Sequence, residues 1–149
     1  SKKPADRSKF VETDLDLDIY DYLNIAISEY ISTFEWLGIC NKITDTGYQL
    51  QRYTANHGKY NEHIDGDQWT DLGVTRICGV IAYLNDVKNG GGTYFSHQDV
   101  YVDAVAGRVA IFPANWTHPH EGKMPISNDK YIISTFLTVD SNNSGYLYK

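Results

Sequence analysis

The sequence has few cysteines, and the two that it has lie far apart. Cys40 and Cys78 form no C-x-x-C pair. Zinc ribbons and thioredoxin-like redox sites need such closely spaced pairs, so neither class of protein is supported. We expect both cysteines to be free, buried thiols.

Long apolar runs and an excess of basic residues are also missing. No segment approaches the roughly 20 consecutive apolar residues of a membrane-spanning helix, so no membrane partner is expected. The net charge of −6 offers no basic surface to a phosphate backbone, and no nucleic-acid partner is expected either. The N-terminal segment SKKPADRSKF lacks the apolar core of a signal peptide, which predicts a cytoplasmic protein.

The length and the first apolar pattern predict one domain that begins with a helix. A chain of 149 residues is the usual size of a domain that buries its own core, so residues 1–149 are treated as a single domain. Apolar residues recur at helical spacing over residues 17–37, and Gly38 follows them. This pattern predicts an amphipathic helix within a helical N-terminal part at about residues 15–38.

The rest of the chain changes to short β-type segments separated by turns, and its 12 tyrosines and 12 glycines suit such a fold. The expected segments lie within about residues 48–139 and read YQLQRYT, RICGVIAYLN, GTYFS, VYVDAV, RVAIFP and YIISTFLTV. Strands that follow one another without intervening helices indicate an antiparallel sandwich or barrel. The predicted fold class is mainly β with an N-terminal helix (α+β).

Two histidine-containing segments are candidates for a metal site. His63 and Asp65 are two residues apart, so on an extended strand their side chains leave the same face. Taken alone, this triplet is typical of a solvated strand end. His118 and His120 follow in NWTHPHEGK, and one of them would complete two histidines and one carboxylate, the facial triad of non-haem Fe(II) enzymes. Alternation does not choose between these two, because both would face the same side of a strand.

Lys130 is the candidate cation for an anionic co-substrate. It precedes YIISTFLTV and by alternation shares a face with Ile132 and Ser134. A lysine among such inward residues is costly unless it meets an anion. The alternative is a lysine at the solvated start of a strand.

These segments together resemble the prolyl 4-hydroxylase type of Fe(II)- and 2-oxoglutarate-dependent oxygenase. The resemblance rests on QRYTANHGKYNEHID, RICGVIAYLNDVKNGGGTYF and GRVAIFPANWTHPHEGKMPISNDKYIISTFL, in this order, over about residues 48–139. It implies a double-stranded β-helix (jelly-roll, cupin-like) core. Because the family's distal histidine stands in an H-x-G or P-H-E context, with the basic residue nine or ten positions later, the resemblance assigns His120 as the third ligand. Fe(II) would then be held by His63, Asp65 and His120, and the C5 carboxylate of 2-oxoglutarate by Lys130.

The resemblance also implies further contacts and cofactors. Tyr83, Thr93 and Tyr53 would line the 2-oxoglutarate site, with core packing of the tyrosines as the alternative. The primary substrate would meet Arg76, Tyr60 and Trp116. O2 would be the second co-substrate, and ascorbate is a candidate reductant. His118 is expected to be solvated, with a place beside the metal site as the alternative.

The implied activity is hydroxylation of an unactivated C–H bond, with a prolyl residue of a peptide or protein as the leading substrate. A free amino acid or another small molecule is the alternative within the enzyme class. A non-catalytic, cupin-like metal-binding protein is the alternative from a different class, but it has no need for Lys130, Tyr83 or the turn before Thr93. A nucleic-acid demethylase would be expected to show arginines after the distal histidine, and none is found there.

Overall fold

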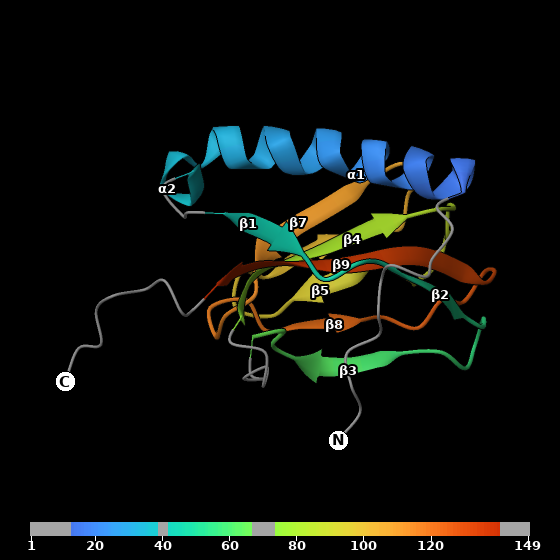
Figure 1. Cartoon of the computed structure of the whole chain (residues 1–149). Helices are drawn as coiled ribbons and strands as arrows, with labels where there is room; N and C mark the ends of the chain where they lie inside the picture. Colours follow the sequence, from blue (N-terminus) through green and yellow to red (C-terminus); the bar gives the residue numbers. More distant parts are fainter. Residues whose placement is uncertain (1–12, 39–41, 67–73, 141–149) are drawn as a thin grey trace, which may run out of the picture.

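The structure, a computed structural model, describes residues 13–38, 42–66 and 74–140 (Figure 1). Helix α1 (Asp14–Thr33) begins three residues earlier than the apolar pattern predicts. Thr13 caps it, since its side chain accepts from the backbone N–H of Asp16 at 3.2 Å while the Asp16 carboxylate accepts from the backbone N–H of Thr13 at 3.0 Å. Such a capping box satisfies two N–H groups that a helix start leaves without partners.

The predicted single helix over residues 17–37 is divided in two at Phe34. A short second helix, α2 (Glu35–Gly38), follows this residue, whose φ and ψ of −109° and 81° are not helical. The hydroxyls of Ser32 and Thr33 donate to carbonyls one turn earlier, which competes with regular helical bonding. Neither proline nor glycine marks this break in the sequence, so the apolar pattern alone does not reveal it.

The larger sheet, sheet A, consists of five antiparallel strands. They are β1 (Ile43–Asp45), β2 (Gln49–Tyr53), β4 (Val74–Tyr83), β7 (Val109–Pro113) and β9 (Lys130–Asp140). The order is β1-β9-β4-β7, and β2 also pairs with β9, because β1 and β2 occupy different ends of that long strand.

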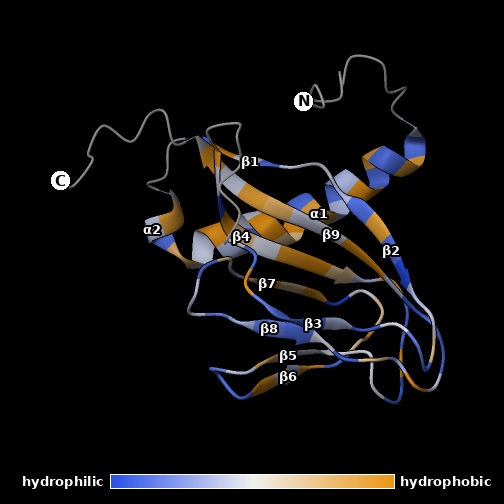
Figure 2. Cartoon of the chain, turned by 90° about the horizontal axis from the view of Figure 1, so that it is seen from below, coloured by the Kyte–Doolittle hydropathy of each residue, from blue (hydrophilic) through white to orange (hydrophobic). Residues whose placement is uncertain are grey.

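The smaller sheet, sheet B, consists of four short antiparallel strands. Its members are β3 (Tyr60–His63), β5 (Thr93–Phe95), β6 (Val100–Val102) and β8 (His120–Gly122), in the order β3-β8-β5-β6. In Figure 1 helix α1 lies on one side of sheet A and sheet B on the other. Figure 2 shows β3 and β8 as mainly hydrophilic, in contrast to the apolar residues of β4 and β9. The predicted fold class, mainly β with an N-terminal helix, is confirmed.

Two buried clusters fix these layers. Leu23 of α1 packs against Cys78, Val80, Ile133 and Leu137 of sheet A, which anchors the helix to the sheet. The second cluster is formed by Tyr83, Val87, Ala104 and Ile132.

Cys78 is buried as predicted, whereas Cys40 lies outside the described residues. Within the described ranges, no helix is both long enough and apolar enough to cross a membrane.

Candidate metal centre

His63, Asp65 and His120 converge at one end of sheet B. His63 ends β3 and His120 begins β8, and the two are direct partners in the antiparallel ladder. His63 Nε2 lies 3.2 Å from one Asp65 carboxylate oxygen, and His120 Nε2 lies 3.7 Å from the other. The three candidate ligand atoms all lie within 4.8 Å of one another. One divalent ion could therefore contact all three.

Both imidazoles have their second nitrogen fixed by a backbone carbonyl two residues earlier. His63 Nδ1 lies 2.8 Å from the carbonyl oxygen of Asn61, and His120 Nδ1 lies 3.1 Å from that of His118. A carbonyl can only accept a hydrogen bond, so in the neutral ring each Nδ1 carries the proton and each Nε2 presents its lone pair. This is the arrangement that usually orients a histidine ligand toward a metal.

Space and hydrogen bonds position the Asp65 carboxylate. Gly79 of β4 faces it so closely that a Cβ at this position would lie 2.4 Å from Asp65 Oδ2. The backbone carbonyl of Asp65 accepts a hydrogen bond from Arg76 Nη1 at 3.2 Å. The next residue, Gly66, donates its N–H to the carbonyl of Ala114 at 2.6 Å. The backbone of Asp65 and Gly66 is thus held by two hydrogen bonds, and the Asp65 side chain is 9% exposed.

Two phenylalanines shield the His120 side of the centre. The ring of Phe112 lies 4.6 Å from the His120 ring and that of Phe95 lies 5.5 Å away, both measured between centroids. Burial lowers the pKa of His120, although its bond to the His118 carbonyl and the nearby Asp65 charge act in the opposite direction. The neutral imidazole, the form that binds metal, is favoured as a result.

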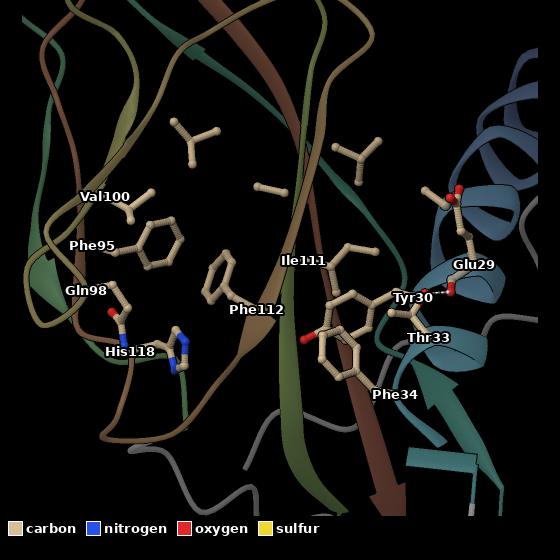
Figure 3. A pocket seen from close by; sticks show the side chains of 14 residues that line it. Glu29, Tyr30, Thr33, Phe34, Phe95, Gln98, Val100, Ile111, Phe112 and His118 are labelled. Atoms are coloured by element: carbon tan, nitrogen blue, oxygen red, sulfur yellow. Dashed lines mark hydrogen bonds between the residues drawn. The ribbon is translucent and has the colours of Figure 1, made fainter. Parts of the chain in front are cut away.

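A cavity of about 540 Å³ lies behind this aromatic wall, between α1 and strands β6 and β7 (Figure 3). Phe95, Phe112 and His118 close its inner end, and Tyr30 and Phe34 line the helix side. None of the three candidate ligands lines it.

His118 contacts the centre through its backbone. Its carbonyl orients His120, while its own Nδ1 is 2.8 Å from Thr117 Oγ1. The side chain is half-buried, and burial lowers its pKa. Of the two histidines left open by the sequence pattern, His120 is therefore the one whose Nε2 meets Asp65.

Lys130 is buried between the sheets at the start of β9, with 2% of its surface exposed. No carboxylate of the described residues lies within 4.0 Å of its ammonium, which is 4.3 Å from the centre of the Tyr53 ring. Burial lowers the pKa of Lys130 to about 8. The alternative of a solvated lysine is excluded, and a buried cation of this kind fits an anionic ligand.

Two of the residues predicted to line the co-substrate site form a buried pair. The hydroxyl groups of Tyr83 and Thr93 lie 2.6 Å apart, and both residues are nearly inaccessible. Burial raises the pKa of Tyr83 to about 12, so this phenol stays neutral in the physiological range. Tyr53 is opposite Lys130 in the β2–β9 ladder, and its hydroxyl donates to Gln51 Oε1 at 2.8 Å.

The three residues predicted to meet the primary substrate differ in their surroundings. Tyr60 is 51% exposed, and its ring lies 4.4 Å from the His63 ring in an edge-on contact. Arg76 is half-buried, with its guanidinium 3.9 Å from the centre of the Phe136 ring. Trp116 is 74% exposed and contributes to no buried cluster of the described residues.

Sequence reasoning missed the shielding by Phe95 and Phe112 and the space at Gly79. An apolar residue on a strand gives the same sequence pattern whether its side chain packs against another apolar residue or against a metal ligand. The only sequence signal for Gly79 is a glycine inside the strand segment RICGVIAYLN, which often marks a close approach.

A protein-family comparison agrees with this geometry. The model of the 2OG-Fe(II) oxygenase superfamily matches residues 48–138, which is more than half of the chain. The chain belongs to this superfamily. The matched domain is accordingly a 2-oxoglutarate-dependent dioxygenase domain, with Fe(II) as its metal and 2-oxoglutarate and O2 as its co-substrates.

Solved structures show the same fold. The viral collagen prolyl hydroxylase from Paramecium Bursaria Chlorella virus-1, in its 2-oxoglutarate complex, aligns with a TM-score of 0.71 at 19% identity, covering 87% of this chain and 76% of that one. The Trichoplax adhaerens prolyl hydroxylase, in complex with a hypoxia inducible factor peptide fragment, aligns with a TM-score of 0.62 at 26% identity, covering 85% of this chain and 60% of that one. The double-stranded β-helix core of the superfamily is therefore confirmed.

A curated relative is similar over a smaller part of its length. The cyclic di-GMP phosphodiesterase RocR of Pseudomonas aeruginosa is 30% identical over 112 residues, which is 74% of this chain and 28% of that protein. The chain spans about a quarter of the length of this relative. The activity in that protein's name is therefore not assigned to this chain.

Proposed function

We propose that this chain hydroxylates an unactivated C–H bond, with Fe(II) held by His63, Asp65 and His120. The observation that carries the proposal is the convergence of two Nε2 atoms and a carboxylate within 4.8 Å. The donor set fits Fe(II), because imidazole and carboxylate are the ligands of non-haem iron and both Nε2 lone pairs are available. Three protein ligands leave other coordination positions for small molecules.

The co-substrate 2-oxoglutarate needs an anchor besides the metal, and Lys130 is the residue proposed for it. Its buried ammonium would bind the C5 carboxylate of 2-oxoglutarate, which would then be its counterion, since no carboxylate of the described residues lies within 4.0 Å. Tyr83 and Thr93 would border the same end, and Tyr53 would cover Lys130 with its ring.

The remaining residues would act through orientation and exclusion of water. Bound together, Fe(II), 2-oxoglutarate and O2 supply the oxidising power to replace C–H by C–OH. The bonds from His63 and His120 to backbone carbonyls keep the two ligands from rotating. Phe95 and Phe112 keep water from the His120 side, and Gly79 leaves the room that the Asp65 carboxylate needs.

A prolyl residue of a peptide or protein is the proposed substrate. The support is the 26% identity to the Trichoplax prolyl hydroxylase, which is described in complex with a peptide. Tyr60 and Arg76 would border the substrate beside the triad, where Tyr60 already contacts the His63 ring. Trp116 would contribute at most an outer contact, given its exposure. The proposed cytoplasmic location rests on the sequence alone.

The test is turnover of 2-oxoglutarate to succinate with Fe(II), in the presence of matched peptides that contain proline or alanine at one position. We expect succinate, together with a mass increase of one oxygen atom on the proline peptide only. If oxygen were incorporated into a free amino acid and not into the peptide, the proposed prolyl substrate would be wrong, but the proposed hydroxylase activity would stand. Binding of metal and 2-oxoglutarate without succinate under any condition would favour the non-catalytic alternative. Asp65→Ala serves as the inactive control.

A further inference from the structure

The long strand β9 begins beside the end of β4, and Lys130 is its first residue. The last direct partners in the β4–β9 ladder are Tyr83 and Ile132. Beyond this pair the chain after β4 adds one backbone bond, from the N–H of Leu84 to the carbonyl of Tyr131 at 2.9 Å. On the β4 side, the ladder therefore ends before it reaches Lys130.

The side chain of Asn85 takes the place of the missing strand. Its Oδ1 accepts the N–H of Tyr131 at 2.8 Å, and its Nδ2 donates to the carbonyl of Asp129, also at 2.8 Å. These two peptide groups belong to the residues on either side of Lys130. Because one partner can only donate and the other can only accept, they fix the orientation of the Asn85 carboxamide.

The opposite side of Lys130 is held by a strand. Successive residues of an antiparallel strand direct their peptide groups toward opposite neighbours, and Lys130 is the direct partner of Tyr53 in β2. The backbone around Lys130 is thus bonded on both sides, by β2 on one side and by the half-buried Asn85 side chain on the other. From this point the Lys130 side chain extends into the protein, with 2% of the residue exposed.

We propose that Asn85 is a positioning residue for the reaction and that it acts through Lys130. This inference rests on the proposed function, in which the Lys130 ammonium binds a carboxylate. A charged hydrogen bond needs a donor–acceptor distance of about 2.7–2.9 Å. The lysine side chain is flexible, so the point that its ammonium reaches depends on where its backbone is held. Asn85 bonds to backbone groups and not to the ammonium, so it is not a catalytic residue.

The test measures the affinity of the Mn(II)-loaded protein for 2-oxoglutarate by calorimetry, without O2. Asn85→Ala removes both bonds, and we expect it to weaken 2-oxoglutarate binding at least about fivefold. The affinity for Mn(II) should stay within about twofold, because Asn85 bonds to no part of the triad. Asn85→Asp keeps the acceptor for the Tyr131 N–H and loses the donor to Asp129, so it should bind 2-oxoglutarate more weakly than the wild type even if Asn85→Ala fails to fold.

Thr138→Val is the matched control for a general loosening of β9. Thr138 is buried at the far end of the same strand, where its Oγ1 donates to the carbonyl of Thr44 at 3.2 Å. The substitution should lower the unfolding temperature and leave the affinity for 2-oxoglutarate within about twofold of the wild type. An equal loss of affinity in Thr138→Val and Asn85→Ala would overturn the inference.

A double-mutant cycle with Lys130→Met tests whether Asn85 acts through the lysine. In the Lys130→Met background, Asn85→Ala should change the remaining affinity by less than about twofold, because the ammonium that it positions is already gone. A full additional loss in this background would overturn the inference. Wild-type affinity in Asn85→Ala or Asn85→Asp would also overturn it but leave the proposed function intact. A wild-type protein that binds no 2-oxoglutarate would overturn both.

Discussion

His63 and His120 face each other across the β3–β8 ladder, with their ring centroids 4.4 Å apart. The pairing of two short strands therefore brings together ligands that are 57 positions apart in the chain (120 − 63 = 57). Asp65 reaches both rings from the turn after β3. A metal bound here would connect β3 to β8 directly, so its binding should stabilise sheet B.

The first prediction separates the two histidines of THPH. His120→Ala removes an Nε2 donor and should weaken Mn(II) or Fe(II) binding by at least about a hundredfold. His118→Ala keeps the backbone carbonyl that orients His120 and should change affinity by less than about fivefold. Calorimetric titration of both variants with Mn(II) measures this difference. Equal losses in the two variants would contradict the assignment of His120.

The second prediction concerns Gly79. An added Cβ would lie 2.4 Å from Asp65 Oδ2 and 2.7 Å from the Phe112 ring, so Gly79→Ala must displace the carboxylate or the ring. We expect a lower unfolding temperature without metal and a smaller rise when Mn(II) is added, because metal binding to the folded state is coupled to its stability. The rise with Mn(II) separates the effect on the site from the effect on packing. A rise equal to that of the wild type would show that Asp65 does not need this space.

The difference between Gly79 and the histidines illustrates how much the sequence could reveal. His63 and Asp65 are close in the chain, so their chemistry is visible as a local pattern. The choice between His118 and His120 depends on which of them pairs with His63, a long-range register that alternation cannot supply because both share one parity. The strands β3 and β8 are short and polar, since they carry ligands instead of an apolar face, and this obscures them in the sequence.

The third prediction is a pH dependence of 2-oxoglutarate binding. The pKa of Lys130 is lowered to about 8 by burial, and a bound carboxylate would raise it again. Above about pH 8 Lys130 of the free protein loses its proton, and binding of the carboxylate then requires that a proton be taken up again. The affinity for 2-oxoglutarate should therefore be flat below about pH 8 and fall above it, by up to tenfold per pH unit.

The groups around Lys130 do not titrate in this window. The pKa of Tyr83 is raised to about 12, and burial also raises the pKa of Tyr53 above its ordinary value. Isothermal titration of the Mn(II)-loaded protein between about pH 7 and about pH 9 should reveal the fall. Lys130→Met should bind weakly and show no such dependence. A wild-type profile that stays flat through this range would exclude Lys130 as the anchor.

The last prediction concerns the stability of the protein without ligands. A base whose pKa is lower in the folded state than in the unfolded state destabilises the fold whenever it is charged in solution. For Lys130 this penalty is fully present below about pH 8, shrinks as the pH rises toward 10.5, and is absent above that value. Lys130→Met keeps a similar length without the charge, so it should stabilise the ligand-free protein at neutral pH, by on the order of 2 kcal/mol.

Urea unfolding of both proteins at neutral pH and near pH 10 measures this effect. The difference between Lys130→Met and the wild type should be larger at neutral pH, because removing the proton that the lysine carries in the unfolded chain costs less free energy as the pH approaches 10.5. Added 2-oxoglutarate with Mn(II) should stabilise the wild type more than the variant, so the difference in unfolding free energy between the two proteins should become smaller or change sign. A variant that is less stable than the wild type without ligands would mean that the buried ammonium is already compensated in the free protein.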